Sequence, residues 1–381
     1  MADPHTPGLS TTPGTATPSP PGSAAPLPAH VVADPVALTR ALVDIESVSG
    51  NERQIADRVE EVLRGAGHLR VERLGHTVMA RTDLGRERRV ILAGHLDTVP
   101  VAGNLPARVD AEAIHGCGTS DMKSGVALAL HLAVAVAAPR YDVTYLFYEA
   151  EEVEAERNGL NQVAKAHPEW LAGDLAVLLE PTYGVIEAGC QGTLRAVVRT
   201  TGVRAHSARS WRGVNAIHAA GEVLDRLRAY QPRRVVIDGC EYREGLNAVG
   251  IRGGVAGNVI PDECEVDVNY RFAPDRSVAA ATDHVREVFA GFEVSVVDVA
   301  GGALPGLATP PAAELLAAVG APPAAKLGWT DVARFAALGV PALNYGPGDP
   351  NLAHARDERV EIAKIRDGAM ILHDWLTAPD R

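Results

Sequence analysis

Cysteines are few in this 381-residue sequence, and no two form a Cys-x-x-Cys motif. The four that occur, Cys117, Cys190, Cys240 and Cys264, are scattered along the chain. Scattered cysteines are typical of a reduced, cytoplasmic protein rather than of a secreted disulfide scaffold. Zinc that serves only to fold a chain requires closed, cysteine-rich sites, so the cysteine pattern argues against that role.

The sequence also lacks long apolar runs and an excess of positive charge. No apolar run approaches the roughly 20 residues needed to cross a bilayer, and the first residues have neither the basic start nor the apolar core of a secretory signal. Asp and Glu number 48 against 36 Lys and Arg, a formal net charge of −12. We therefore expect a soluble protein with no membrane partner and no nucleic-acid partner, because both polyanions repel an acidic chain.

The first 30 or so residues are rich in Pro, Thr, Ala, Ser and Gly and contain almost no large apolar side chains. Such a segment cannot bury enough surface to offset the entropy lost on ordering. We expect residues 1–33 to be a disordered tail, and the first helix to open after Asp34-Pro35.

From residue 34 onward, apolar segments typical of strands alternate with segments typical of helices. The strands are expected within 88–100, 141–152 and 175–182, and a nearly all-apolar helix within 124–138. This alternation predicts an α/β fold with a mostly parallel sheet and helices on both faces. Functional groups gather at the carboxyl ends of such strands, and His95, Glu151 and Glu180 each lie at one.

The middle of the chain follows a different pattern. Residues 192–305 are predicted as β-α-β-β-α-β, the order of a ferredoxin-like split βαβ unit. We expect a small α+β domain there, inserted into a larger domain made of residues 34–191 and 306–381.

The polar residues at the strand ends are those that bind metals. His95 and Asp97 in GHLDTVP would lie on one face, with Asp97 placed to orient the imidazole. Asp121 lies in a glycine-rich loop before the apolar helix, where a helix cap is the simpler interpretation. Glu151 and Glu152 could divide the work, one binding metal and one accepting a proton. Glu180, and His354 in a late loop, complete the set, although each alone is an ordinary loop residue.

Together these residues provide the mixed nitrogen and oxygen ligands of zinc or a similar divalent ion. A catalytic metal usually has three protein ligands. Five ligands are enough for two metals with three ligands each if one carboxylate binds both metals. The sequence therefore predicts two divalent cations.

The motifs GHLDTVP, GCGTSDMKSG, EAEE, EPT and the late histidine, in this order, resemble the di-zinc aminoacylase and carboxypeptidase family from about residue 35 to the C-terminus. The resemblance implies two zinc ions, for which Co²⁺ or Mn²⁺ can substitute. It implies that His95, Asp121 and Glu180 hold one ion, that Asp121, Glu152 and His354 hold the other, and that Asp121 bridges them. Glu151 would be the general base, Asp97 would orient His95, and the peptide after Asp121 would be cis.

The same resemblance implies a homodimer. The inserted domain would serve as lid and dimerisation domain, and its His206 would reach the active site of the neighbouring subunit to stabilise an oxyanion. Asn258, Arg271 and Arg334 would bind the substrate, a small N-acyl amino acid.

Within the family, three segments are most similar to the succinyl-diaminopimelate desuccinylases. The chain departs from their pattern at Cys190-Gln191, where an Arg-Arg pair is usual, and at residues 328–331, so we expect a rearranged recognition of the substrate carboxylates. The alternatives are another N-acyl-amino-acid deacylase (such as an acetylornithine deacetylase), a dipeptidase or carboxypeptidase, and a metal-binding scaffold without activity. A scaffold would be expected to lack the base or a ligand, and all six positions are filled.

Overall fold

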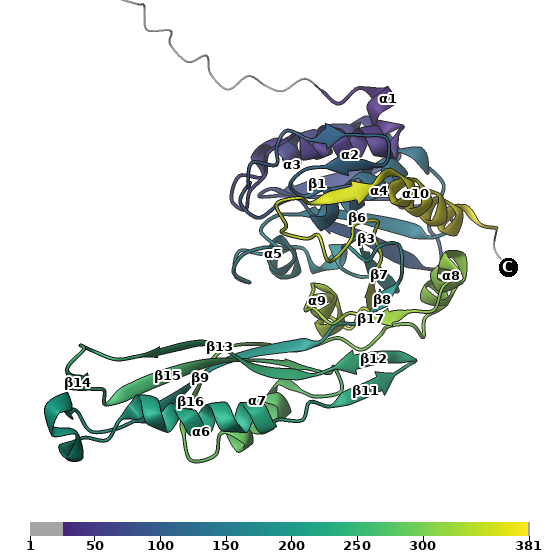
Figure 1. The fold of residues 1–381 in the computed structure, drawn as a ribbon. Coiled ribbons are helices and arrows are strands. Elements are labelled where there is room, and N and C mark those ends of the chain that lie inside the picture. The colour runs from purple at the N-terminus through teal and green to yellow at the C-terminus, as the bar shows by residue number, and fades with distance from the viewer. Residues whose placement is uncertain (1–25, 380–381) are drawn as a thin grey trace, which may run out of the picture.

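The computed structural model describes residues 26–379, and its two largest β-sheets lie one above the other in Figure 1. The larger sheet is mainly parallel and is flanked by helices, as the alternation of segments predicted. The smaller sheet is antiparallel and comes from the middle of the chain. The protein is therefore a mixed α/β protein. The domain boundaries expected at residues 191/192 and 305/306 stay a prediction.

The larger sheet has eight strands. Their order is β1 (Arg70–Leu74), β2 (Thr77–Arg81), β6 (Asp142–Tyr148), β3 (Arg89–His95), β7 (Leu175–Leu178), β18 (Ala342–Asn344), β8 (Glu187–Ala188) and β17 (Ala324–Ala325). Strands β6, β3, β7 and β18 are parallel to their neighbours in this group. The register pairs His95 with Tyr148, so β3 and β6 end side by side and deliver their following residues to one edge.

Both faces of this sheet are covered, which explains why its central strands are mostly apolar. Along β3, Val90 and Leu92 pack into one core while Ile91 and Ala93 pack into the other. The first core contains helices α2 (Pro35–Val43), α3 (Arg53–Gly65), α4 (Ser124–Ala135), α8 (Pro310–Val319) and α10 (Ile362–Thr377). The second contains α5 (Gly159–Ala166), η2 (Pro168–Trp170) and α9 (Val332–Ala337).

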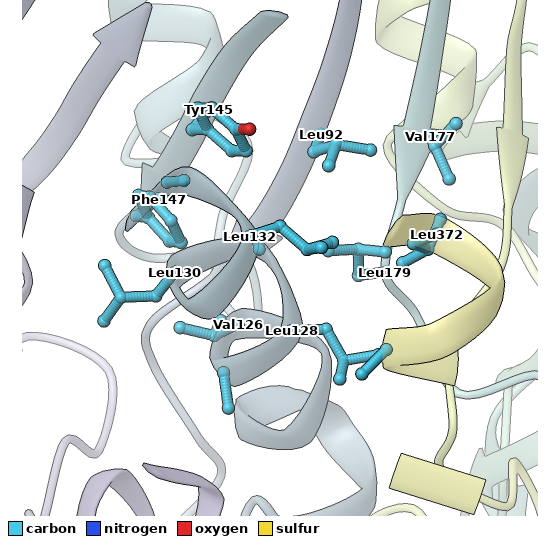
Figure 2. Close-up of a cluster of buried hydrophobic side chains, with 14 of the residues drawn as sticks. Leu92, Val126, Leu128, Leu130, Leu132, Tyr145, Phe147, Val177, Leu179 and Leu372 are labelled. Atoms are coloured by element: carbon cyan, nitrogen blue, oxygen red, sulfur yellow. The ribbon is translucent and has the colours of Figure 1, made fainter. Parts of the chain in front are cut away.

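The apolar helix predicted within 124–138 is α4, which ends at Ala135. Figure 2 shows α4 packed against the sheet with α10 beside it: Leu92 and Val177 lie on the strands, and Leu372 lies on α10. Helix α4 has almost no polar face, because all its residues from Ser124 to Ala133 except the half-buried His131 are buried.

The smaller sheet has the predicted β-α-β-β-α-β order. It consists of β9 (Gly192–Thr201), α6 (Ala216–Ala229), β13 (Gly245–Gly253), β15 (Glu263–Phe272), α7 (Val278–Val288) and β16 (Glu293–Ala300). The strands lie in the order β13-β15-β9-β16, all antiparallel, and both helices cover the face turned away from the larger sheet (Figure 1). The sequence did not reveal the hairpin β11 (Arg234–Ile237) and β12 (Cys240–Arg243), which pairs only with itself.

Short elements complete the described chain. A three-stranded sheet is formed by β19 (Arg359–Glu361), β5 (Ala113–His115) and β4 (Arg108–Val109), and a two-stranded one by β10 (Ala205–His206) and β14 (Val259–Ile260). Single-turn helices are η1 (Thr119–Lys123) and η3 (Ser207–Arg212). No helix within residues 26–379 is both long and apolar enough to cross a membrane.

The predicted tail was too long at its C-terminal end. Residues 1–25 lie outside the described residues, but Ala29–Val32 form helix α1. Val32 is buried and packs into the first core, with Leu27 and Val31 against it. Asp34 then caps α2, its carboxylate accepting the N–H of Val36, which agrees with the expected helix start at Asp34-Pro35.

Candidate metal centre

Residues that could bind a metal lie at the carboxyl edge of the larger sheet and in two loops. His95 is the last residue of β3, Glu151 and Glu152 follow β6, and Glu180 follows β7. Asp121 comes from the loop before α4, and His354 comes from the loop before β19. Segments far apart in the sequence thus deliver the six side chains because parallel strands end at a common edge.

Asp121 is the centre of the cluster. Its Oδ1 lies 3.1 Å from Nε2 of His95, and its Oδ2 lies 3.4 Å from Nε2 of His354. The two carboxylate oxygens therefore face different imidazoles, as a carboxylate shared between two sites requires. The peptide bond between Asp121 and Met122 is cis, as the resemblance implied.

Glu152 closes the cluster from the β6 side. Its Oε1 lies 2.8 Å from Nε2 of His354, and ligand atoms of His95, Asp121 and Glu152 all lie within 4.8 Å of one another. A mixture of imidazole nitrogens and carboxylate oxygens at this spacing fits zinc and related divalent cations. These residues can therefore hold a metal.

The charges of the cluster also favour a cation. Hydrogen bonds to Asp121 and Glu152 raise the pKa of His354 to about 10. Burial alone would lower the pKa of His95, but its hydrogen bonds to Asp121 and Asp97 outweigh burial and raise it. Both shifts have the same cause, the carboxylates that crowd around the two imidazoles, and a divalent cation would balance this negative charge.

Glu151 and Glu180 are two carboxyls of the site whose pKa is raised. Burial, together with the negative charge of Asp331, raises the pKa of Glu151 well above its ordinary value. Burial and the charge of Asp121 raise the pKa of Glu180 to about 8. A carboxylate whose pKa is raised is a stronger base than an ordinary one, which suits a residue that takes a proton from water.

Asp97 was expected to orient His95 through its carboxylate, but most hydrogen bonds of that carboxylate go to other groups. Nδ1 of His95 lies 3.0 Å from the backbone oxygen of Asp97 and 3.5 Å from its Oδ1. The carboxylate of Asp97 accepts the N–H groups of Glu151 (3.0 Å) and Glu152 (3.1 Å) and the hydroxyl of Ser49 (2.7 Å). Asp97 therefore holds the turn that carries both glutamates as well as the imidazole.

The other expected site residues lie away from this cluster. His206 and Asn258 are exposed neighbours in the smaller sheet's unit, where the oxygen of Asn258 accepts the N–H of Ser207. No hydrogen bond or ion pair joins His206 to the cluster among residues 26–379; its Nδ1 accepts the N–H of Ala208. Arg271 is half-buried near the end of β15, and burial lowers its pKa.

Arg334 already forms an ion pair with a carboxylate of the protein. It lies on α9, donates from Nε to Asp331, and stacks over Trp329 at 5.0 Å. Asp331 is fully buried and also accepts a hydrogen bond from Asn158 at 2.9 Å.

Sequence reasoning missed two buried carboxylates beside the cluster, Asp331 and Glu358. Glu358 accepts backbone N–H groups of the loop that carries Asp121, and burial raises its pKa to about 7. In the sequence, nothing distinguishes Glu358 from its neighbour Asp357, which is exposed. For Asp331, the signal available was its place in the segment that departs from the family pattern.

Comparison with known proteins places these features in context. The sequence model of peptidase family M20/M25/M40 matches residues 91–378. A Mycobacterium tuberculosis protein, provisionally named succinyl-diaminopimelate desuccinylase, is 59% identical over 346 residues, covering 90% of this chain and 98% of its own. The succinyl-diaminopimelate desuccinylase of Corynebacterium glutamicum is 51% identical over 358 residues, covering 91% and 97%.

A solved structure has the same fold at much lower identity. The Bacillus subtilis YXEP protein, described as a dinuclear metal binding peptidase of the M20 family, matches with a TM-score of 0.64. It is 17% identical in sequence, and the match covers 90% of this chain and 96% of that one.

Proposed function

We propose that this chain, which belongs to peptidase family M20/M25/M40, is a succinyl-diaminopimelate desuccinylase. It would hydrolyse N-succinyl-LL-2,6-diaminopimelate to succinate and LL-2,6-diaminopimelate, a step of lysine and cell-wall biosynthesis in the cytoplasm. The observation that carries the proposal is the Asp121 cluster with the half-buried Glu151 beside it. The named relative from Corynebacterium, similar over nearly its whole length, supports the choice of substrate.

The residues present fit two divalent cations. We propose that His95, Asp121 and Glu180 hold one zinc ion and that Asp121, Glu152 and His354 hold the other. The two oxygens of Asp121, each facing a different imidazole, support this division. Zinc bound there would polarise the amide carbonyl and lower the pKa of the attacking water.

Glu151 is the proposed general base. Its carboxylate takes a proton from the water as the water oxygen attacks the amide carbon. When the carbon–nitrogen bond breaks, Glu151 returns that proton to the leaving amine nitrogen. The raised pKa of Glu151 supports this role, because a carboxylate with a raised pKa is a stronger base than an ordinary one. Asp97 keeps Glu151 in place through its backbone N–H.

Arg271 is the better candidate of the two arginines for the substrate carboxylate. Arg334 already donates to Asp331, whereas Arg271 forms no ion pair with a carboxylate in the part of the chain that the structure describes. A half-buried guanidinium gains most from a bidentate carboxylate. Gln191, which stands where an Arg-Arg pair is usual, donates to the backbone oxygen of Arg243. Arg271 would therefore have to supply the charge.

His206 and Asn258 would act from a second subunit in a homodimer. Both are exposed, and within residues 26–379 no hydrogen bond or ion pair joins either of them to the cluster of its own chain. A symmetric dimer would let each subunit supply His206 to its partner's site, where the imidazole stabilises the oxyanion.

The first test measures succinate release from N-succinyl-LL-diaminopimelate by the zinc-loaded protein and by the variant Glu151→Gln. The variant should bind two zinc equivalents but lose kcat by about 10²–10⁴-fold, the usual contribution of a general base. The control Glu154→Gln alters an exposed carboxylate of the same acidic stretch and should keep wild-type kcat.

Two outcomes would contradict the proposal separately. A zinc-loaded wild type that ignores the succinyl substrate but cleaves N-acetylornithine or a dipeptide would replace the substrate and keep the chemistry. Wild-type kcat in Glu151→Gln would remove Glu151 from its role as base.

A further inference from the structure

One buried carboxylate, Glu358, collects the N–H groups of the loop that carries Asp121. Its Oε1 accepts the N–H of Ser120 at 2.8 Å and that of Asp121 at 3.0 Å. Its Oε2 accepts the N–H of Gly118 at 2.9 Å. The side chain is 2% exposed, so these hydrogen bonds to a charged group form away from water, where they are strongest.

The same segment carries His354, four residues before Glu358 in the chain. The backbone oxygen of residue 358 accepts the N–H of Gly116 at 3.0 Å. The hydroxyl of Ser120 donates to the oxygen of Arg359 at 2.8 Å and accepts the N–H of Asp349 at 3.1 Å. The loop from Gly116 to Asp121 is thus attached along its length to the segment that bears the second imidazole.

The two segments approach each other as closely as backbones can. A Cβ on Gly348 would lie 2.4 Å from the backbone oxygen of Ser120, so only glycine fits there. Glu358 then fixes the orientation of the loop at this contact, because three N–H groups of the loop donate to its carboxylate.

We propose that Glu358 is a positioning residue for the metal centre: it holds Asp121 so that its two carboxylate oxygens face His95 and His354. This proposal rests on the role of Asp121 as shared ligand in the proposed function. Glu358 touches no metal ligand side chain in the described structure; it acts on the backbone N–H of Asp121 itself. Partners that orient metal ligands typically change metal affinity by about 10–100-fold when mutated.

Metal affinity without substrate is the direct test. Glu358→Gln keeps the shape of the side chain but replaces one oxygen by an NH₂ group, which must then face a backbone N–H as donor against donor. We expect the affinity for Co²⁺ at one of two sites to fall by about 10–100-fold. The measurement is a Co²⁺ titration of the metal-free protein, followed by its visible absorption and by competition with a chromophoric chelator.

A matched control distinguishes the effect of the hydrogen bonds of Glu358 from the effect of removing a negative charge near the metal centre. Asp357→Asn removes the same charge one residue away, from a side chain that is 77% exposed. It should leave the Co²⁺ affinity within about twofold of wild type, because exposed charges are screened. Equal losses in Asp357→Asn and Glu358→Gln, or unchanged affinity in a folded Glu358→Gln, would overturn the proposal.

Folding is checked on the metal-free forms by circular dichroism and thermal unfolding. If Glu358→Gln does not fold, Glu358→Asp decides, since it keeps the charge but is too short to reach all three N–H groups. Reduced Co²⁺ affinity with an altered Co²⁺ spectrum in Glu358→Asp supports the proposal, and wild-type affinity and spectrum overturn it. A wild type that binds two Co²⁺ but releases no succinate refutes the substrate while leaving this test intact.

Discussion

At the scale of single residues, the protein repeatedly uses a buried carboxylate to gather backbone N–H groups. Asp97 does so for the turn of Glu151 and Glu152, and Glu358 for the loop of Asp121. Asp142, far from the metal centre, does the same at the start of β6. A carboxylate offers several acceptor positions and a full charge, so it can order a loop whose N–H groups have no partner in a sheet or helix.

Asp142 allows this device to be tested through pH without involving the metal centre. Burial raises its pKa, but the N–H groups of Leu84 and Arg86 and the hydroxyl of Thr82 outweigh burial, and the pKa lies below its ordinary value. A lowered pKa in the folded state means that the ionised form stabilises the protein above the unfolded pKa, about 3.9. This contribution is lost as the pH falls through the folded value.

Asp142→Asn should therefore lower the free energy of unfolding at pH 7 by roughly 1–3 kcal/mol, the usual effect of losing hydrogen bonds to a buried charge. The difference from wild type should shrink below about pH 4, where the wild-type carboxyl begins to protonate. Urea unfolding at both pH values measures it. Asp83→Asn, at a side chain 55% exposed, is the control and should change stability by less than about 1 kcal/mol. A difference that does not depend on pH would contradict the assignment to charge.

At the scale of elements, the contact between α4 and the end of β7 brings two ligand-bearing segments together. Gly125 lies four residues after Asp121, and a Cβ at Gly125 would lie 2.1 Å from the backbone oxygen of Leu179, the residue before Glu180. Glycine at this position lets the helix lie directly against the chain after β7. The distance between Asp121 and Glu180 thus depends on a missing side chain.

Gly125→Ala should force α4 away from this segment. We expect a loss of roughly 1–3 kcal/mol in unfolding free energy, as for other overpacked cores, together with weaker zinc binding. Gly221→Ala in α6 is the matched control: no atom lies within 4 Å of its added Cβ, so the change should stabilise the protein by about 0.5–1 kcal/mol. Thermal unfolding and zinc titration of both variants provide the comparison. If Gly125→Ala is destabilised but binds zinc with normal affinity, the helix contact does not determine the geometry of the metal site.

The sequence predicted those elements whose burial leaves a regular pattern of apolar residues. The apolar strands β3, β6 and β7 and the helix α4 were predicted because burial on both faces leaves only apolar residues. The polar residues that follow these strands were predicted for the same reason, since parallel strands place them at one edge. The hairpin β11–β12 and helix α1 were not, because they are short and are fixed by tertiary packing. Glu358 could not be predicted either, because its partners are backbone N–H groups some 240 residues away.

At the scale of the whole molecule, the unit that contains the smaller sheet has exposed functional candidates but no complete site. His206 is exposed at β10, and Trp211 nearby is 79% exposed. The metal cluster of the same chain has no contact with either of them in the described residues. A symmetric dimer would resolve this, since each subunit would lend His206 to the other.

Mixed dimers test this arrangement directly. Glu151→Gln and His206→Ala should each be nearly inactive as homodimers, because every site lacks its base or its oxyanion donor. A mixed dimer combines Glu151 of one subunit with His206 of the partner subunit and so contains one complete site. Random exchange of an equal mixture makes half of the dimers mixed, so about a quarter of wild-type activity should return. Recovery that rises with the time of subunit exchange supports action across the dimer. If light scattering shows a dimer that exchanges subunits and activity does not return, His206 acts within its own chain or not at all.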